Sequence, residues 1–349
     1  MSSPQLSIII PVLNEVANLP ALLEQIQKQT GCTLEVIVAD GGSNDEAPAI
    51  AGSLGAICIA SQPGRGVQMN SGAKIAKAGL LLFLHADSTL TTPTLLIDAI
   101  NCWNKNAQIL AHGLIAGHFT LQFNQQPENR QGVFRFYEAK TALNRPQCTN
   151  GDQGFLISRD FFWQLGGFSQ KLPFLEDQIL ASQIYQLGVW ITLPGTLITS
   201  ARRFKVEGLG RRMILNAIIM AFHHTGFEVF FARAATVYRQ QDSSVQLKMT
   251  PFFKLINTMH RELGIKEEIA HWRRIGAYVR EAAWQLFFLM DLIATNRFNW
   301  QKRPFLAFHD RVFRPLTNFL PFDLLTALLT WIWFKLTALY FAIREHNSK

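Results

Sequence analysis

Charged residues and cysteines are scarce in this chain, and each shortage excludes a class of protein. Only 17% of the 349 residues are charged and 48% are hydrophobic, whereas soluble domains usually carry about 25% charged residues. The four cysteines have no paired spacing, which excludes a disulfide framework and a zinc site and indicates free thiols in a reducing compartment. Motifs of nucleic-acid-binding proteins are also absent, so nucleic acid is not an expected partner.

The start of the chain lacks an apolar leader segment. Met1-Ser2-Ser3-Pro4 pass directly into the first apolar run. Because a secretory signal needs an apolar core of its own, we expect the N-terminal part of the protein to lie in the cytoplasm. The length suffices for two domains, or for one large domain with an appendage.

What the first ninety residues do have is three short apolar runs, each followed by a polar tip. The runs are Leu6–Val12, Leu34–Ala39 and Leu80–Leu84. Such runs are typical of strands buried on both faces, and helical spacing between them predicts a parallel sheet with right-handed crossovers. The tips carry Glu15, Asp40 and Asp87. Since the carboxyl ends of parallel strands lie at one edge, we expect these three carboxylates in one cleft.

The same patterns predict further elements. Helices are expected over Asn18–Gln29, Glu46–Leu54, Val67–Lys77, Pro93–Lys105, Phe134–Leu143 and Glu176–Leu187. Strands are expected over Leu114–Phe123, at the end of Gly151–Ser158 and over Val189–Leu193, with a polar loop over Gln125–Arg130. We place one domain over residues 1–239, with apolar helices at 205–235, and a basic, aromatic-rich helical region over residues 240–349.

Five motifs occur in one order along the chain. They are Pro11-Val12-Leu13-Asn14-Glu15, Asp40-Gly41-Gly42-Ser43-Asn44-Asp45, Gly64-Arg65-Gly66-Val67-Gln68-Met69-Asn70, His85-Ala86-Asp87 and Glu176-Asp177. Together they resemble the motif set of family 2 glycosyltransferases, from about Leu6 to Leu193, and are similar to a subgroup with L-H-A-D at the metal motif, the selenodomain-associated transferase 2 group. The resemblance implies the nucleotide-diphospho-sugar transferase (GT-A) fold, an α/β fold with a mostly parallel mixed sheet, here followed by a C-terminal helical region.

The resemblance implies a donor site at the strand tips. Pro11 and Leu13 would contact the nucleotide through their backbone, Asp40 would hold the base, and Glu15 the ribose or base. The alternative for Asp40 is a turn-forming role, which fits Asp45 better. The alternative for Glu15 is a charge at a helix N-terminus.

Arginines are expected to contact the diphosphate of the donor. Arg65 and Gly66 belong to a glycine-rich turn that opens a helix, where backbone N–H groups and one cation bind phosphate. Arg202 and Arg203 follow the last strand and are predicted as further diphosphate contacts. A juxtamembrane basic patch is the equally weighted alternative for this pair.

Asp87 is the residue on which a metal site would depend. A divalent cation held by a carboxylate neutralises charge on a leaving diphosphate, and such cations keep oxygen-rich shells. The family usually has Asp at the position of His85. His85 is therefore either a second ligand or ribose contact, or a strand-end histidine bonded to the backbone. Imidazole would favour Mn²⁺ over Mg²⁺, and both cofactors stay open.

By the same resemblance, Asp177 is the base that takes the proton from the attacking hydroxyl, and Glu176 orients it. The alternative is that both carboxylates only favour a helix N-terminus. Asp152 and Gln153 are predicted to shape the acceptor side.

The last third of the chain carries most of the excess positive charge. From Gln240 on there are 15 Lys and Arg and nine Asp and Glu, which gives this part +6 of the net charge of +8. A basic, aromatic-rich region indicates an anionic membrane surface. Leu324–Ile343 is about long enough to span a bilayer, but Lys335 lies inside it and Asp323 at its edge. Because a central charge costs roughly 2.5–3.5 kcal/mol, burial in a bundle or an interfacial position is preferred.

The sequence therefore predicts an inverting, metal-dependent glycosyltransferase, peripheral at the inner face of the cell membrane. It would move a hexose from a UDP- or GDP-sugar to a hydroxyl of a lipid-like or glycan acceptor. Three alternatives stay open. One is a polyprenyl-phosphate sugar transferase, which needs no base. Another is a nucleotidyltransferase, against which Pro11–Glu15 argues, because a Gly- and Arg-rich stretch is usual there. The last is an inactive membrane-associated scaffold, supported by His85.

Overall fold

A computed structural model of the chain describes residues 3–110, 114–124, 131–241, 246–298 and 302–347; the predicted loop over Gln125–Arg130 lies outside them. The chain divides into two compact units, Met1–Arg202 and Arg203–Lys349, which we call unit 1 and unit 2. We predicted the boundary between residues 239 and 240 instead. The division lies earlier because the apolar helices at 205–235 pack on the helices that follow them and bury their apolar faces in the helical unit.

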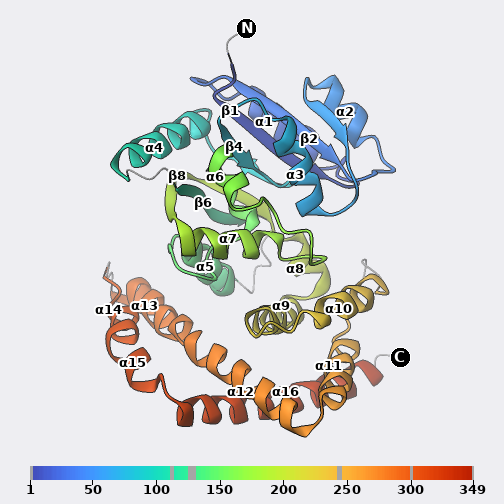
Figure 1. The fold of residues 1–349 in the computed structure, drawn as a ribbon, viewed down its shortest axis with the longest axis vertical. Coiled ribbons are helices and arrows are strands. Elements are labelled where there is room, and N and C mark those ends of the chain that lie inside the picture. Colours follow the sequence, from blue (N-terminus) through green and yellow to red (C-terminus); the bar gives the residue numbers. More distant parts are fainter. Residues whose placement is uncertain (1–2, 111–113, 125–130, 242–245, 299–301, 348–349) are drawn as a thin grey trace. The chain divides into compact units, whose positions relative to one another are not determined.

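Unit 1 is built on an eight-stranded mixed sheet in the order β3-β2-β1-β4-β7-β6-β8-β5 (Figure 1). Its strands are β1 (Leu6–Val12), β2 (Leu34–Asp40), β3 (Ile57–Ala60), β4 (Leu80–Phe83), β5 (Thr89–Leu90), β6 (Ile115–Asn124), β7 (Phe155–Ser158) and β8 (Val189–Ser200). β1 pairs in parallel with β2 and β4, β2 with β3, and β6 with β8, whereas β7 is antiparallel to both its neighbours and β5 is antiparallel to β8. The predicted fold class, a mostly parallel mixed sheet followed by a helical region, is confirmed.

Helices cover both faces of this sheet. One layer consists of α1 (Leu19–Gln27), α2 (Ala47–Ser53) and α4 (Leu95–Ile109), and the other of α3 (Arg65–Ile75), α6 (Arg159–Gln164) and α7 (Glu176–Leu187). All residues of β1 are buried. Ile8 and Ile10 pack into the first layer and Ile9 into the second, because successive side chains of a strand point to opposite faces. A strand covered on both faces needs the nearly continuous apolar run that the sequence has here. Its one polar side chain, Ser7, is buried and donates a hydrogen bond to Glu35 (2.7 Å).

Some elements of unit 1 differ from the sequence patterns. β3 is a short edge strand that is mostly exposed, although all four of its residues, Ile57 to Ala60, are apolar; we did not predict this strand. β8 continues past the predicted end at Leu193, through Gly195, whose φ is 88°. Its pairing with β6 shifts register between His118 and Thr120. The glycine accommodates the irregularity, so a residue pattern that indicates a turn lies inside a strand.

Unit 2 consists of helices in its described residues. They are α8 (Arg202–Glu207, starting at the boundary), α9 (Leu209–His224), α10 (Val229–Arg239), α11 (Thr250–Leu263), α12 (Ile265–Glu281), α13 (Trp284–Phe298), α14 (Pro304–Phe308), a π-helical turn His309–Phe313, α15 (Arg314–Thr317) and α16 (Leu320–His346). Unit 1 also contains α5 (Gln131–Thr141), which packs beside β6.

The last helix of unit 2 is fastened at its C-terminal end. Glu345 accepts hydrogen bonds from the backbone N–H groups of Met249 (2.9 Å) and Thr250 (3.0 Å) and forms an ion pair with Arg211. The first N–H groups of a helix have no partner within the helix, so this carboxylate caps α11 from α16. The last turn of α16 is thereby joined to α9 and to the start of α11.

Candidate active site

The tips of β1 and β2 are joined by reciprocal hydrogen bonds. The Asn14 N–H donates to Ser43 Oγ (2.9 Å), and Asn14 Oδ1 accepts from the Asn44 N–H (2.8 Å). Asn14 has a φ of 57°, a left-handed conformation in which asparagine is enriched. These bonds fix the loop after Pro11, which is buried, and leave the side chain of Leu13 46% exposed at the sheet edge.

A buried glutamine ties these tips to α3. The Gln68 amide donates to the carbonyl oxygens of Val12 and Ala39, both at 2.8 Å, and accepts from the Gly64 N–H at 3.3 Å. Buried polar groups are costly unless they are hydrogen-bonded, and here each bond also fixes a loop of the site. Sequence reasoning included Gln68 in a motif without giving it a role; its signal is an amide one turn after Gly64.

Asp40 forms a turn within its own loop. Its carboxylate accepts from the backbone N–H groups of Gly42 (3.1 Å) and Ser43 (3.2 Å). Asp45, for which we expected the turn-forming role more strongly, also accepts from backbone N–H groups, including that of Val16 (2.9 Å). A carboxylate has about four acceptor positions, so these bonds leave Asp40 able to accept from a base, and that role stays a prediction.

Asp87 lies in a cluster of negative charge beyond the end of β4. Burial raises the pKa of Asp87, and the charges of Asp152 and Glu15 raise it further, while His85 lowers it. Glu15 is held by a hydrogen bond from the Asn18 side chain (2.7 Å). Carboxylates from two other loops are therefore close enough to shift the protonation of Asp87.

His85 is paired with a carboxylate. Its Nδ1 lies 2.7 Å from Asp152 Oδ1, and its side chain is 13% exposed. Burial alone lowers the pKa of His85, but the hydrogen bond and charge of Asp152 outweigh it, so the pKa lies above its ordinary value. The predicted alternative, a bond to the backbone, is not the contact observed. Because Nδ1 is occupied, Nε2 is the nitrogen left for a ligand.

Asp177 is oriented by two backbone donors. Its Oδ2 accepts from the Gly151 N–H and its Oδ1 from the Gln178 N–H, both at 2.8 Å. A Cβ at Gly151 would lie 3.2 Å from His85 Nε2 and 3.3 Å from Asp177 Cβ, so a glycine lets this loop pass between the two groups. The preceding Leu175 has a φ of 75°. Strain of this kind in a bulky residue is found at functional sites.

Arg65 at the start of α3 pairs with Glu176 at the start of α7. Arg65 Nε lies 3.1 Å from Glu176 Oε1, and the two side chains are 46% and 6% exposed. Burial raises the pKa of Glu176, whereas the charge of Arg65 lowers it. A Cβ at Gly66 would come within 2.9 Å of the Ser169 carbonyl oxygen. Only glycine therefore allows α3 this close approach.

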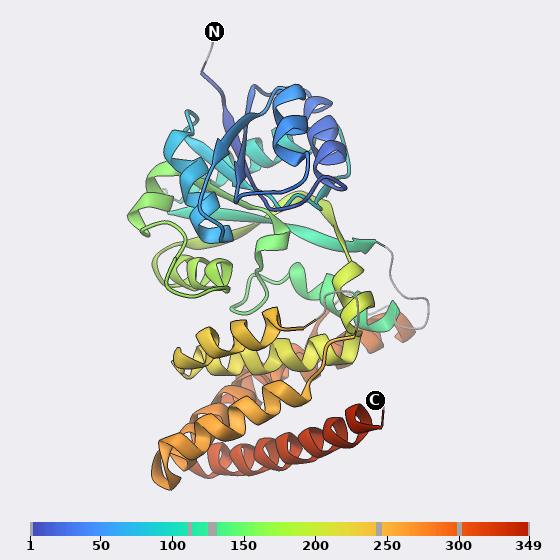
Figure 2. The same ribbon diagram turned by 90° about the vertical axis from the view of Figure 1, so that its right-hand side faces the viewer.

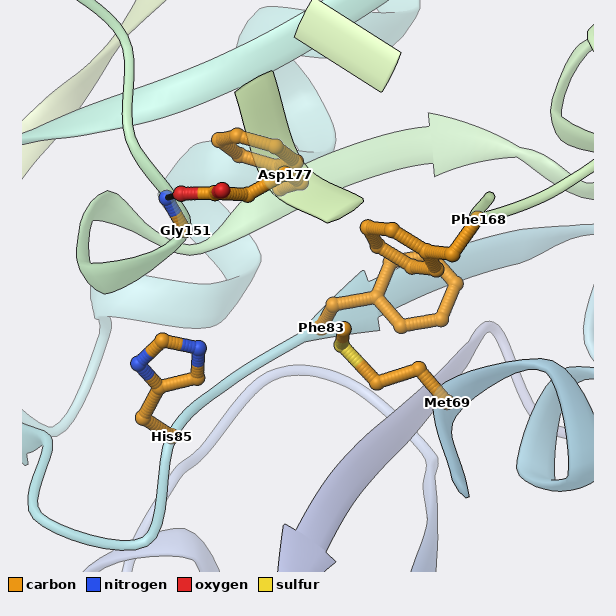
Figure 3. A pocket seen from close by; sticks show the side chains of 7 residues that line it. Met69, Phe83, His85, Gly151, Phe168 and Asp177 are labelled. Carbon is orange, nitrogen blue, oxygen red and sulfur yellow. Dashed lines mark hydrogen bonds between the residues drawn. The ribbon is translucent and has the colours of Figure 1, made fainter. Parts of the chain in front are cut away.

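A small pocket lies among these groups (Figure 3). It is lined by Met69, Phe83, His85, Gly151, Phe155, Phe168 and Asp177. Figure 3 shows His85 and Asp177 on one side and the rings of Phe83 and Phe168 on the other. Its volume of about 10 Å³ is room for about one water molecule. A molecule of the size of a sugar nucleotide does not fit inside this pocket.

Gln153 supports the loop that carries Asp152. Its side chain is fully buried, and its amide lies 2.9 Å from His118 Nδ1 and 3.1 Å from the Phe119 carbonyl oxygen. We predicted that Gln153 shapes the acceptor side. In this position it would do so only through the conformation of the loop, and its role on the acceptor side stays a prediction.

Arg202 and Arg203 make local contacts at the boundary of the two units. The Arg202 N–H donates to Ser200 Oγ (3.1 Å), and Arg203 Nε lies 4.0 Å from Glu207 Oε1 within α8. These contacts do not join them to the charged groups above. Their predicted role at the diphosphate stays a prediction.

The donor set fits a divalent cation that also binds substrate. No group of three or more His, Cys, Asp or Glu side chains is placed to hold a metal ion in the described part of the chain, so Asp87 and His85 would be the protein ligands. Mg²⁺ in nucleotide sites is often held by one or two carboxylates plus phosphate oxygens. The raised pKa of Asp87 beside Asp152 and Glu15 marks negative charge that such a cation would offset.

Comparisons with known proteins find relatives of the N-terminal part of the chain. Residues 7–166 match the model of glycosyl transferase family 2. A PGL/p-HBAD biosynthesis glycosyltransferase of Mycobacterium tuberculosis is 43% identical over 97 residues, which cover 26% of this chain and 38% of that protein. An uncharacterized glycosyltransferase of Haemophilus influenzae is 29% identical over 186 residues, covering 49% and 59%. The chain thus spans less than two thirds of the length of these relatives.

Among solved structures, the chain is similar to glucosyl-3-phosphoglycerate synthase from Mycobacterium tuberculosis. The complex with phosphoglyceric acid has 17% sequence identity and a TM-score of 0.38, covering 56% of this chain and 70% of that one. The complex with Mn²⁺, UDP and glucosyl-3-phosphoglycerate has 16% identity and a TM-score of 0.37, with the same coverage.

Proposed function

Residues 7–166 belong to glycosyl transferase family 2, and from this premise we propose that the protein is an inverting, metal-dependent glycosyltransferase. It moves a hexose from a UDP- or GDP-sugar to a hydroxyl of a lipid-like acceptor. It works in the cytoplasm, at the inner face of the cell membrane.

The observation that carries this proposal is a cluster of charged side chains from separate loops at one sheet edge. Its members are Arg65, His85, Asp87, Asp152, Glu176 and Asp177. Four of these carboxylates act on the single arginine. Burial lowers the pKa of Arg65, but the charges of the four carboxylates outweigh this effect and raise it. A site with this balance binds an anionic diphosphate only together with further positive charge, which accounts for the metal dependence that we propose.

The N-terminus of α3 supports the binding of the donor diphosphate. Helix N-termini present backbone N–H groups and the positive end of the helix dipole, and Arg65 adds a full charge beside them. Pro11, Leu13, Asp40 and Glu15 then hold the base and the ribose at the neighbouring strand tips.

Asp177 acts as the general base toward the acceptor hydroxyl. The hydroxyl oxygen bonds to the anomeric carbon as the bond from that carbon to the diphosphate oxygen breaks, and the hydroxyl proton passes to Asp177. One displacement of this kind inverts the anomeric centre. Glu176 fixes the start of α7 through Arg65 and so keeps Asp177 in place. A phosphate acceptor, such as a polyprenyl phosphate, would arrive deprotonated and would not need Asp177.

A bound Mn²⁺ or Mg²⁺ would neutralise the charge that develops on the leaving diphosphate. Asp87 would hold it, and His85 Nε2 would be the second ligand. Asp152, which is bonded to His85 Nδ1, orients the imidazole, as carboxylates commonly do for metal-bound histidines. Asp152 thus contributes to the metal side in addition to the acceptor side for which we predicted it.

A donor panel tests the proposal. We expect UDP- or GDP-sugars to raise the melting temperature of the full chain in the presence of Mn²⁺ but not in its absence. We also expect the protein to hydrolyse the stabilising donor slowly when the metal is present. Stabilisation by a nucleoside triphosphate with a sugar phosphate, rather than by a nucleotide sugar, would indicate the nucleotidyltransferase. Donor binding with neither hydrolysis of the donor nor transfer to any lipid or glycan acceptor would indicate the scaffold.

A further inference from the structure

We infer that unit 2 binds an anionic membrane through the outer face of α16, with this helix lying in the plane of the interface rather than crossing the bilayer. The outer face is the side formed by Leu325, Leu328, Ile332, Leu336, Leu339 and Ile343. The inference rests on one statement of the proposed function, namely that the acceptor is lipid-like and lies at a membrane, and it deepens that statement. It names the surface of the protein that would make the contact.

The outer face is apolar and uncovered along the whole helix. Its residues recur every three or four positions, so they form one stripe, and each of them is exposed, from 39% for Ile332 to 63% for Leu336. From Leu325 to Ile343 the stripe is about 27 Å long at 1.5 Å per residue. An exposed apolar surface of this extent marks an interaction site in a natural protein.

The opposite side of α16 is packed against the rest of unit 2. Ala327, Phe334 and Phe341 recur every seven residues and are buried. Phe253 of α11 lies against both phenylalanines, and Gly276 of α12 lies against the backbone of Ala327. α16 runs beside α12 in both views (Figures 1 and 2). The helix therefore has one side for the protein and one for another partner.

The two charged side chains in and beside the apolar stretch, Asp323 and Lys335, point away from the outer face. Asp323 Oδ1 accepts from Arg280 Nε of α12 at 2.7 Å, and Lys335 Nζ donates to Asn257 Oδ1 of α11 at 2.7 Å. Both side chains reach back to neighbouring helices. Nothing charged is left in the stripe between Leu325 and Ile343.

A spanning position is ruled out by what α16 is attached to. Among the described residues it is the one helix long and apolar enough to cross a bilayer, and only 17% of its most apolar window is buried, unlike the core helix of a soluble protein. Inserting it would, however, draw in α12, whose exposed residues include Lys266, Glu267, Arg273, Arg274 and Glu281. Each charge is costly in the hydrocarbon core, whereas an interfacial helix leaves them in water.

Charge complementarity selects an anionic lipid surface as the occupant. The segment that leads into α16 exposes Lys302, Arg303, Arg311 and Arg314 and has one acidic residue, Asp310. Basic residues next to an interfacial helix attract anionic headgroups. A second copy of this positively charged segment would instead be repelled.

Vesicle flotation with the full chain tests this inference. The test variant carries Ile332→Glu and Leu336→Glu on the outer face. The matched control carries Ile269→Glu and Val279→Glu, which place the same two charges at exposed apolar positions of α12. We expect the wild type and the control to float with vesicles of phosphatidylcholine and phosphatidylglycerol, and the test variant to bind at least about tenfold more weakly. Melting curves and size exclusion confirm that each variant is folded.

Other outcomes would overturn the inference. Equal binding of the test variant and the control would remove the outer face from the contact. Resistance of the vesicle-bound protein to carbonate extraction would show a spanning helix. A wild-type dimer that the test variant alone converts to a monomer, without vesicle binding, would assign the face to a second copy. Metal-dependent hydrolysis of the donor in solution is measured on the same samples, so a failure of the proposed chemistry is seen separately from a failure of membrane binding.

Discussion

The two units of this protein differ in how much apolar surface they expose. Unit 1 buries its apolar residues in the two layers around the sheet and gathers charged groups at one edge. Both units bury some polar groups, such as Gln153 in unit 1 and His271 in unit 2, but most of the large exposed apolar side chains of the described residues lie in unit 2. The first pattern is that of an enzyme core. The second is that of a structure that must expose apolar surface to a partner.

The comparison teaches where each function can be disrupted independently. The charged cluster depends on loops of unit 1, and the outer face depends on α16. Changes within one unit should therefore leave the other property intact, and the following predictions test this separation from the largest expected effect to the smallest.

Loss of the base should affect turnover alone. Asp177→Asn keeps an oxygen that can accept a backbone hydrogen bond but removes the basicity. We expect turnover with a hydroxyl acceptor to fall by about 10²–10⁴, the usual contribution of general acid–base catalysis, with unchanged donor affinity and unchanged vesicle binding. Steady-state kinetics and calorimetry measure the two quantities. Turnover close to that of the wild type would instead favour a phosphate acceptor.

Loss of the metal-holding charge should affect donor binding. Asp87→Asn retains the oxygen but not the charge, so the Mn²⁺-dependent part of the affinity for the nucleotide sugar should fall by about 100-fold or more, since even groups behind the metal ligands contribute 10–100-fold. Asp98→Asn, at an exposed position of α4, is the matched control. Calorimetric titration with Mn²⁺ measures the effect, and an unaltered affinity would exclude Asp87 as the ligand.

Acidification should weaken unit 2 more than unit 1. Burial lowers the pKa of His260 to about 4. Burial and the charge of His260 lower the pKa of His271 to about 3. Nε2 of His260 lies 2.9 Å from Nδ1 of His271. Because the unfolded chain binds these protons near pH 6.5, the stability that the neutral pair contributes is present above that pH and is lost as the pH falls toward 4. Between pH 7 and pH 5 the loss should be about 2–4 kcal/mol.

Unit 1 has no such one-sided response. Burial lowers the pKa of His118, but the pKa of His85 is raised, because its bond to Asp152 outweighs burial, so their contributions have opposite signs over the same range. Hydrogen exchange of α11 and α12 against β1, β2 and β4 at pH 7 and pH 5, corrected for the intrinsic rates, compares the units. Equal destabilisation of both would contradict the prediction.

Two glycines offer the finest comparison. A Cβ at Gly66 would meet the Ser169 carbonyl oxygen at 2.9 Å, and one at Gly276 would meet the Ala327 nitrogen at 2.5 Å. Alanine at either position should destabilise its own unit by about 1–3 kcal/mol through overpacking. Only Gly66→Ala should also weaken donor binding. Urea unfolding monitored by hydrogen exchange measures each unit.

Matched controls for these variants exist in each unit. Gly52 lies in α2 and Gly210 in α9, and a Cβ at either meets nothing within 4 Å. Their replacement by alanine should be neutral or stabilising by up to about 1 kcal/mol, since alanine favours helix more than glycine does. Destabilisation by the control variants as large as that by Gly66→Ala and Gly276→Ala would show that contact with backbone is not the cause.

The sequence predicted the parts of the fold that have a strong local signal. Leu6–Val12 is one apolar run because both faces of β1 are covered, and its bounds are those of the observed strand. The exposed edge strand Ile57–Ala60 has an apolar run of only four residues, and we did not predict it. We predicted that β8 ends before Pro194-Gly195, because this pair is typical of a turn. The strand continues because it pairs with β6, which lies far away in the sequence, and a local pattern does not show such pairing.

The charged cluster was predictable in its members but not in its pairings. Motif order brings His85 and Asp177 to the same edge, but it cannot show that His85 bonds to Asp152, 67 positions away. Nor can it show that Gln153, beside Asp152, points into the core. Side-chain direction depends on loop conformation, here on Gly151, and that conformation is set by contacts that only the folded chain provides.

The bond between Glu345 and the start of α11 has a consequence for how the protein is made. Domains fold largely as units during synthesis, the N-terminal one first, and every strand of unit 1 leaves the ribosome well before the chain is complete. Glu345 lies 96 positions after Met249, from whose N–H it accepts a hydrogen bond, so α11 cannot be capped in this way until α16 has been synthesised. Unit 1 can therefore fold on the nascent chain, whereas unit 2 can close only once α16 is available. During that interval its apolar helices are exposed to chaperones and to the membrane at the same time.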